Sequence, residues 1–130
     1  LKTDIVDIFN SIGRGTLSEL SIDFDNKATV CKYAVPEGYP DKPVKGKRID
    51  ITSVSNKNSL FFASVDIEGD HLIEAGSRTV AVVGIASSIS QAEKIAEEEI
   101  SKVAGPLFHR EDIGTDDLIR ARVEHMESLR

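Results

Sequence analysis

The sequence has few of the residues on which disulfide-linked, membrane-spanning and nucleic-acid-binding proteins depend. Its 130 residues include one cysteine and no tryptophan, and 5% of them are aromatic. One cysteine excludes a disulfide within the chain, and no apolar run approaches the roughly 20 residues of a membrane span. A net charge of -6 opposes binding to a phosphate backbone, and the N-terminus lacks the layout of a signal peptide. We therefore expect a cytoplasmic protein with neither a nucleic-acid nor a membrane partner.

The rest of the composition is typical of one globular domain. Hydrophobic residues make up 40% of the chain and charged residues 29%, and the length has room for one ordinary domain. The chain begins at Leu1, already in a segment with helical periodicity, and not at a methionine. We therefore expect residues 1–130 to be a single domain cut from a longer protein.

Three segments have the hydrophobic spacing of helices. The first is capped by Thr3 and stopped by Gly13, the second begins at Ser88 or Ser90 and ends at Gly105-Pro106, and the third is capped by Thr115. In the second helix one apolar stripe is predicted to be buried, with Glu97, Glu98 and Glu99 facing water; the stripe is formed by Ile89, Ala92, Ile95, Ala96, Ile100 and Val103.

The remaining apolar segments are predicted to be strands. They are Ile22 to Phe24, Ala28 to Val35, Arg48 to Val54, Leu60 to Ile67, His71 to Ala75 and Thr79 to Ala86. Glu68-Gly69-Asp70 predicts a hairpin turn, and the proline-rich stretch from Pro36 to Lys47 predicts a loop. The nearly all-apolar last strand predicts burial on both faces, and Cys31 is expected to be a buried, unreactive thiol. The fold class is α+β, a curved antiparallel sheet with flanking helices.

The chain shows no pattern of a complete catalytic or metal centre. Its histidines, at positions 71, 109 and 125, lack the spacing of a zinc site. No nucleophile elbow and no glycine-rich phosphate loop is present. We therefore predict no catalytic residue and no metal ligand in this chain.

Two segments stand out as candidate sites. Gly76, Ser77 and Arg78 combine backbone N–H groups, a hydroxyl and a guanidinium, which suits a phosphate or carboxylate, although a solvated hairpin turn has the same composition. The charges between Phe108 and Gly114 can either form ion pairs that fix the last helix or bind a ligand.

Four stretches, read in order, resemble one known family. They are LKTDIVDIF (residues 1–9), ATVCKYAVPEGYP (28–40), SRTVAVVGIASSISQAEKIAEEEI (77–100) and FHREDIG (108–114). Together they resemble the C-terminal domain of phosphoribosylamine–glycine ligase, also called glycinamide ribonucleotide synthetase, an ATP-grasp enzyme of purine biosynthesis. The closing TDDLIRARVEHM is similar to the archaeal branch of that family.

The resemblance implies the function of a larger parent enzyme. That enzyme joins glycine to 5-phosphoribosylamine and cleaves ATP to ADP and phosphate. ATP and magnesium or manganese would be bound by ATP-grasp domains absent from this chain. This fragment, with the fold of the barrel-sandwich-hybrid-like C-terminal domain, would pack on the ATP-grasp and N-terminal domains, form one wall of the substrate site and be inactive alone.

The resemblance also bears on individual residues. An arginine at the start of the equivalent strand contacts the substrate phosphate in related enzymes, which implies that Gly76, Ser77 and Arg78 contact the ribose phosphate. Many bacterial relatives have His-Ala-Gly-Thr where this chain has Phe62 to Val65, so a contact from that threonine is not expected. The alternative function is a self-standing small-ligand-binding or dimerisation module without enzymatic activity.

Overall fold

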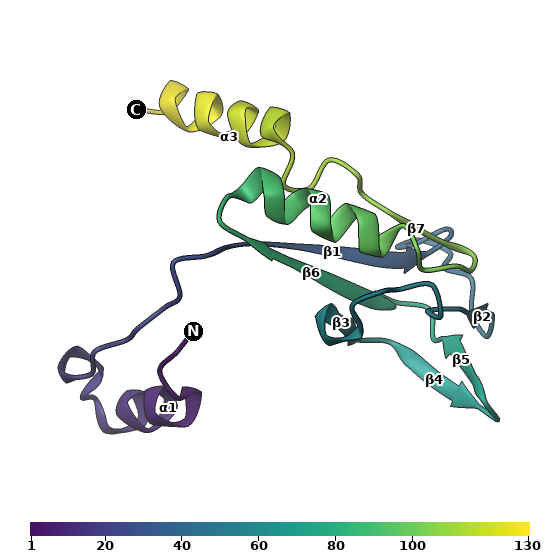
Figure 1. Ribbon diagram of the computed structural model, residues 1–130, viewed down its shortest axis with the longest axis horizontal. Helices are drawn as coiled ribbons and strands as arrows, with labels where there is room; N and C mark the ends of the chain where they lie inside the picture. Colours follow the sequence, from purple (N-terminus) through teal and green to yellow (C-terminus); the bar gives the residue numbers. More distant parts are fainter.

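The strands divide between two antiparallel sheets in the computed structural model, which describes residues 1–130 (Figure 1). One sheet has the order β3-β6-β1-β7, formed by Leu60–Phe62, Val80–Ala86, Ala28–Pro36 and Leu107–His109. The other has the order β2-β5-β4, formed by Arg48–Ile49, His71–Glu74 and Val65–Glu68. The helices are α1 (Ile5–Arg14), α2 (Ile89–Ile100) and α3 (Asp116–Ser128), with short 3-10 turns at Leu17–Glu19 and Lys57–Ser59. The predicted α+β class is confirmed.

The pairing of β1 with β6 organises the larger sheet. The two strands run antiparallel from the Ala28–Ala86 pair to the Ala34–Val80 pair, and α2 lies across one face of them (Figure 1). Because side chains alternate along a strand, Lys32 and its second neighbours point toward α2 while Cys31 and its second neighbours point away. The core under α2 contains Val30, Ala34, Ile49, Leu60, Val80, Val82, Ala92, Ala96 and Ile100.

Helix α2 begins as predicted but ends earlier. The Ser88 side chain accepts a hydrogen bond from the N–H of Gln91 and caps the first turn. The helix stops at Ile100, because Ala104 exchanges two backbone hydrogen bonds of 2.8 Å with Asp50 and so leaves the helical path. The predicted end at Gly105-Pro106 is therefore wrong.

The buried stripe of α2 is narrower than predicted. Ala92, Ala96 and Ile100 are buried, but Ile95 is 41% exposed, so its placement in the core is wrong. We expect Ile100→Ala to lower the free energy of unfolding by about 3 kcal/mol, because the truncation leaves a cavity in the main core. Ile95→Ala should cost less than about 1 kcal/mol. Urea denaturation of both variants checks this, and equal losses would contradict the observed orientation of α2.

Several strand predictions require correction. Residues 22–24 form no strand, because the backbone of Asp23 bonds to Lys2 and to the Thr3 side chain instead of to a sheet. Asp4, not Thr3, caps α1. The segment predicted as one strand from Leu60 to Ile67 breaks at Ala63 and Ser64, where the chain passes from one sheet to the other. The strand predicted from Arg48 to Val54 ends at Ile49, whereas the hairpin of β4 and β5 is confirmed.

The face of β6 that points away from α2 is buried at the start of the strand, where Ala81 is 2% exposed, but open at its end, so the predicted burial on both faces holds only for the first part of β6. The side of the sheet opposite α2 carries no covering element (Figure 1). Ile85 on this side is 57% exposed, and Cys31, predicted to be buried, is exposed there as well. Apolar side chains at the end of β6 are therefore exposed, because no helix or strand of this chain packs against that face.

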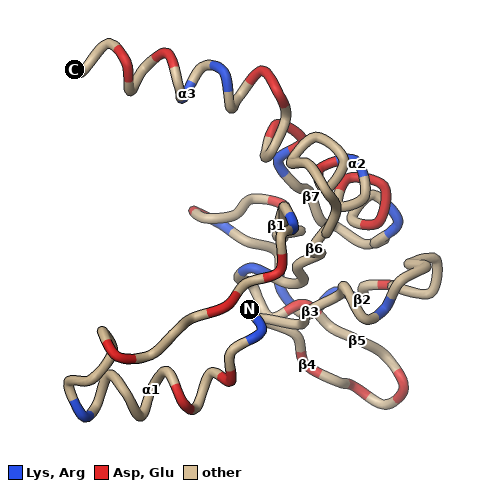
Figure 2. The backbone as a smooth tube through the Cα atoms, turned by 60° about the vertical axis from the view of Figure 1, so that its left-hand side comes forward, with Lys and Arg blue, Asp and Glu red and all other residues tan.

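The two terminal helices lie away from the sheets (Figure 2). Helix α1 buries only Ile8 and exposes the large apolar residues Ile5, Val6, Phe9 and Ile12. Helix α3 has no buried residue. None of the helices is long and apolar enough to cross a membrane.

Candidate functional site

The open face of the four-stranded sheet contains a hollow of about 320 Å³. Residues from β1, from the turn before β6 and from the segment around β7 line it: Cys31, Tyr33, Val35, Tyr39, Arg78, Phe108, Arg110 and Ile113. The strand order β6-β1-β7 brings these distant segments together. Tyr33 is paired with Ala81, and Val35 with Phe108, so the side chains of one strand face lie next to each other. The hollow therefore has an apolar floor and two guanidinium groups.

Arg78 is the guanidinium of this hollow that has no carboxylate partner. Its guanidinium carbon lies 5.6 Å from the centroid of the Tyr33 ring, which is a cation–π contact. Arg110, in contrast, donates two hydrogen bonds of 3.0 and 2.7 Å to Asp112. Because no protein side chain neutralises Arg78, it is free to bind an anion such as a phosphate.

A buried carboxylate shapes the turn that carries Arg78. Glu74 is 1% exposed and accepts hydrogen bonds of 3.1 Å from the N–H groups of Lys47 and Gly76. Gly76 has a φ of +87°, a conformation that favours glycine, and the Thr79 hydroxyl donates to the carbonyl of Ser77. The turn is thus fixed from within and presents Arg78 to the hollow.

The three residues predicted to form the site lie in one turn but differ in accessibility. Arg78 lines the hollow, whereas Gly76 and Ser77 are half-buried and do not line it. The N–H of Gly76 is already donated to Glu74. The assignment of the three residues as a ribose-phosphate contact stays a prediction. The hollow brings Arg78 together with Phe108 and Arg110 of the second candidate segment. Tyr33 was not predicted as a site residue, and its place on the same face follows from strand register.

A buried ionic network lies on the other side of β1, beneath α2. Lys32 is 1% exposed, and its ammonium group donates to Glu93 (2.7 Å), to Glu97 and to the carbonyl of Glu111 (2.8 Å). The second oxygen of Glu97 bonds to Nε2 of His109 at 2.9 Å. We call Lys32, Glu93, Glu97 and His109 the Lys32 network.

Burial and hydrogen bonding have opposite effects on the charges of the Lys32 network. Burial favours neutral Lys32, but its hydrogen bonds to Glu93 and Glu97 outweigh burial and raise its pKa above the ordinary value. Burial likewise opposes ionisation of Glu97, yet the hydrogen bonds from Lys32 and His109 lower its pKa below the ordinary value. Lys32 is therefore charged and forms ion pairs with Glu93 and Glu97.

The sequence predicted that the three consecutive glutamates of α2 all face water, but two of them do not. Glu97 turns toward Lys32, and buried Glu99 accepts hydrogen bonds from the N–H groups of Ser55 and Asn56 and from Lys102. The predicted exposure of Glu97 and Glu99 is therefore wrong. Lys32 of β1 is the partner of Glu97, and the backbone N–H groups of a distant loop are partners of Glu99. Between Phe108 and Gly114 one ion pair is present, Arg110–Asp112, but it makes no contact with α3, so the predicted fixing of the last helix by ion pairs stays a prediction. Thr115 caps α3 as predicted.

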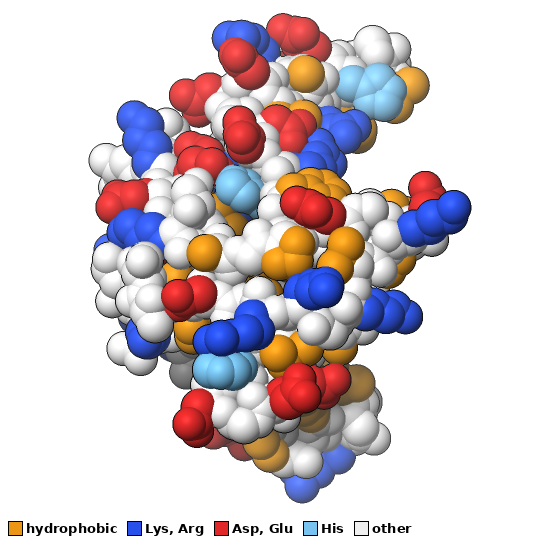
Figure 3. Space-filling model, turned by 90° about the vertical axis from the view of Figure 1, so that its right-hand side faces the viewer, with side chains coloured by type: hydrophobic (Ala, Val, Ile, Leu, Met, Phe, Trp, Pro, Cys, Tyr) orange, Lys and Arg blue, Asp and Glu red, His pale blue; other side chains and the backbone are white.

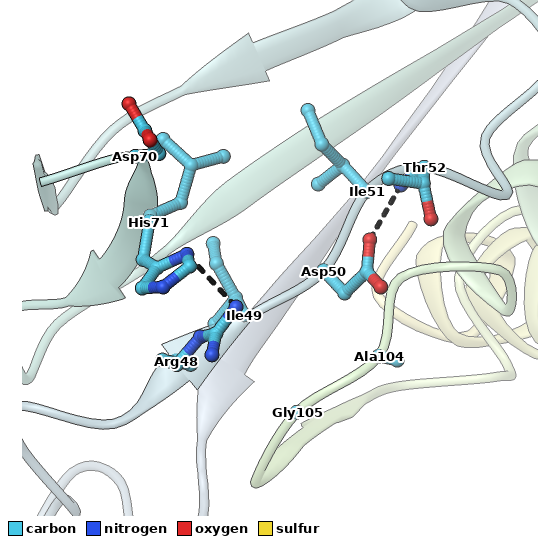
Figure 4. A pocket seen from close by; sticks show the side chains of 10 residues that line it. Arg48, Ile49, Asp50, Ile51, Thr52, Asp70, His71, Ala104 and Gly105 are labelled. Atoms are coloured by element: carbon cyan, nitrogen blue, oxygen red, sulfur yellow. Dashed lines mark hydrogen bonds between the residues drawn. The ribbon is translucent and has the colours of Figure 1, made fainter.

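A second hollow, of about 460 Å³, lies beside the three-stranded sheet (Figure 4). Arg48 donates a hydrogen bond of 2.8 Å to Nδ1 of His71, and Asp50 accepts one of 2.7 Å from the N–H of Thr52. Asp50 and Asp70 both line this hollow. Their negative charges oppose a phosphate, so the hollow that holds Arg78 is the better phosphate site.

Other features of the structure point to neither a metal centre nor a basic surface. No group of three or more His, Cys, Asp or Glu side chains is placed to hold a metal ion. On the face shown in Figure 3, acidic and basic side chains are interspersed around small hydrophobic areas. That face carries no continuous basic surface of the kind that binds a nucleic-acid backbone.

Comparison with known proteins gives one family. Residues 29–116 match the family model described as phosphoribosylglycinamide synthetase, C domain. Curated relatives named phosphoribosylamine–glycine ligase include one from Methanococcoides burtonii, 45% identical over 130 residues, and one from Methanococcus maripaludis, 47% identical over 132 residues. The alignments cover 100% and 99% of this chain but 30% of each relative, so the chain spans about a third of their length.

A solved structure supports the same relationship. The chain is similar to the crystal structure of phosphoribosylamine–glycine ligase from Thermotoga maritima, with a TM-score of 0.56 and 30% sequence identity. The match covers 62% of this chain and 20% of that one.

Proposed function

The chain belongs to the phosphoribosylglycinamide synthetase C-domain family, and from this we propose that it is the C-terminal part of a ligase that joins glycine to 5-phosphoribosylamine with cleavage of ATP. This part forms one wall of the substrate site and does not catalyse the reaction alone. ATP and its magnesium or manganese ion bind to the ATP-grasp domains of the longer protein, because this chain carries neither a phosphate-binding loop nor a cluster of metal ligands.

The observation that carries the substrate-site part of this proposal is the unpaired guanidinium of Arg78 at the edge of an apolar hollow. The substrate 5-phosphoribosylamine has a phosphate, and a guanidinium binds phosphate oxygens with two parallel hydrogen bonds. Tyr33 and Phe108 offer flat apolar surfaces beside it, against which the ribose can pack. The arrangement binds and orients the substrate and takes no part in bond making.

The open apolar surfaces support an association with further domains of the same chain. The large apolar residues Phe9 on α1, Ile85 on β6 and Phe108 on β7 are all exposed. Exposed apolar groups of this size on several elements are typical of surfaces that another domain covers. We propose that the ATP-grasp and N-terminal domains supply that cover.

Replacing Arg78 tests the phosphate contact. In the full-length ligase, Arg78→Ala should raise the KM for phosphoribosylamine about tenfold to a hundredfold, which corresponds to the loss of a hydrogen bond to a charged group. The KM for ATP should stay within about twofold, because ATP binds elsewhere. Steady-state kinetics with each substrate varied in turn measures both values.

Arg48→Ala is the matched control for this experiment. Arg48 is also exposed, but it lies in the other hollow and contacts His71. Its removal takes away the same charge and should leave the KM for phosphoribosylamine unchanged. If Arg78→Ala and Arg48→Ala have equal effects on that KM, Arg78 does not contact the substrate phosphate.

A further inference from the structure

We propose that the Lys32 network is a positioning device for the substrate hollow: it holds β7 and the residues after it so that Phe108 and Arg110 stand beside Arg78. The role of the hollow itself rests on the function proposed above. Lys32, Glu97 and His109 are accordingly positioning residues, since none of them lines the hollow.

The strand β7 has few other attachments. It is a three-residue edge strand that pairs only with β1, through Ala34–His109, Val35–Phe108 and Pro36–Leu107. Phe108 is exposed, and no residue of β7 is fully buried. An edge strand that is short and poorly buried gains little stability from its own packing, so its placement depends on additional contacts.

The Lys32 network supplies such contacts at two points of this segment. Glu97 of α2 bonds to the ring of His109, and Lys32 of β1 bonds to the carbonyl of Glu111. Because side chains alternate along the strand, fixing His109 on the helix side directs Phe108 and Arg110 to the opposite side. Both of these residues line the hollow with Arg78.

The same strand links the network to the floor of the hollow. Lys32 lies between Cys31 and Tyr33, which point into the hollow from the other side of β1. The ion pairs of Lys32 with Glu93 and Glu97 clamp β1 to α2. One cluster therefore fixes both the floor of the hollow and its β7 side, at residues that never touch the ligand.

The test compares two glutamates of α2 in the full-length ligase. Glu97→Ala removes the contacts to Lys32 and His109, whereas the control Glu99→Ala removes contacts to residues 55, 56 and 102. Glu97→Ala should raise the KM for phosphoribosylamine about tenfold with little change in kcat, since a displaced contact weakens binding. It should also speed amide hydrogen exchange at residues 108–112. Glu99→Ala should do neither, although it also destabilises the domain.

Variants of His109 keep the proposal testable if Glu97→Ala does not fold. His109→Ala should reproduce the faster exchange and the higher KM, and His109→Gln, whose amide can still donate to Glu97, should restore both toward the wild-type values. Unchanged exchange at residues 108–112 in both alanine variants would overturn the positioning role. Equal KM effects of Glu97→Ala and Glu99→Ala, or faster exchange with an unchanged KM, would overturn it as well.

The two proposals fail in distinguishable ways. If Arg78→Ala leaves the KM for phosphoribosylamine unchanged, the proposed phosphate contact is wrong. The exchange rates at residues 108–112 still show whether the Lys32 network holds β7.

Discussion

Lys32→Ala is expected to lower the free energy of unfolding by about 3–5 kcal/mol, the usual cost of removing one partner of a buried ion pair. Lys32 is 1% exposed and is the only lysine or arginine that forms ion pairs with Glu93 and Glu97. Its removal leaves two partly buried carboxylates facing each other without the ammonium group between them. The carbonyl of Glu111 also loses its hydrogen bond.

Chemical denaturation of the two variants Lys32→Ala and Lys102→Ala measures this effect. Lys102 also contacts two glutamates of α2, but its own side chain is 26% exposed, and buried Glu99 keeps its hydrogen bonds from the N–H groups of Ser55 and Asn56. We expect a much smaller loss of the free energy of unfolding for Lys102→Ala. Similar losses in the two variants would show that Lys32 does not stabilise the interface of β1 and α2 through its buried charge.

Gly84→Ala is expected to be the most disruptive single-methyl addition in the sheet. A Cβ atom at this position would lie 1.9 Å from the carbonyl oxygen of Ala92 and 2.9 Å from the amide nitrogen of Ala96, both backbone atoms of α2. Backbone cannot rotate aside as a side chain can, so the helix must move off β6. We expect a loss of about 3 kcal/mol, at the upper end for overpacked cores, and a lower midpoint of thermal unfolding.

Gly13→Ala is the control for the added methyl group. Gly13 lies within α1, and a Cβ there meets no atom within 4 Å. Alanine favours a helix over glycine by about 1 kcal/mol, so this variant should not be destabilised. A Gly84→Ala protein as stable as the wild type would mean that α2 does not approach β6 as closely as described.

Local patterns predicted much of the secondary structure. The hairpin at Gly69 and the cap at Ser88 depend on residues next to each other in the sequence, and both are present. The prediction that Ile95 is buried was wrong. The small side chains of Ala92 and Ala96 let α2 approach the sheet closely, so that only a narrow face of the helix is buried. The division of residues 60–67 between two sheets depends on partners far along the chain, and no local pattern shows it.

The site was accessible to sequence reasoning only in part. The chemistry of Arg78 and the family resemblance were enough to place it in a candidate site. Its neighbours Tyr33 and Phe108 lie far from it in the sequence, and only the order β6-β1-β7 brings them together. Lys32 within an apolar strand was an unused signal, since a buried lysine requires anionic partners.

A crystal structure of the full-length ligase with glycinamide ribonucleotide bound tests the role of Arg78 most directly. We expect the guanidinium of Arg78 to donate to the phosphate of the ligand at about 3 Å, with Tyr33 and Phe108 beside the ribose. A phosphate bound elsewhere, with Arg78 facing solvent or paired with a carboxylate of another domain, would contradict it.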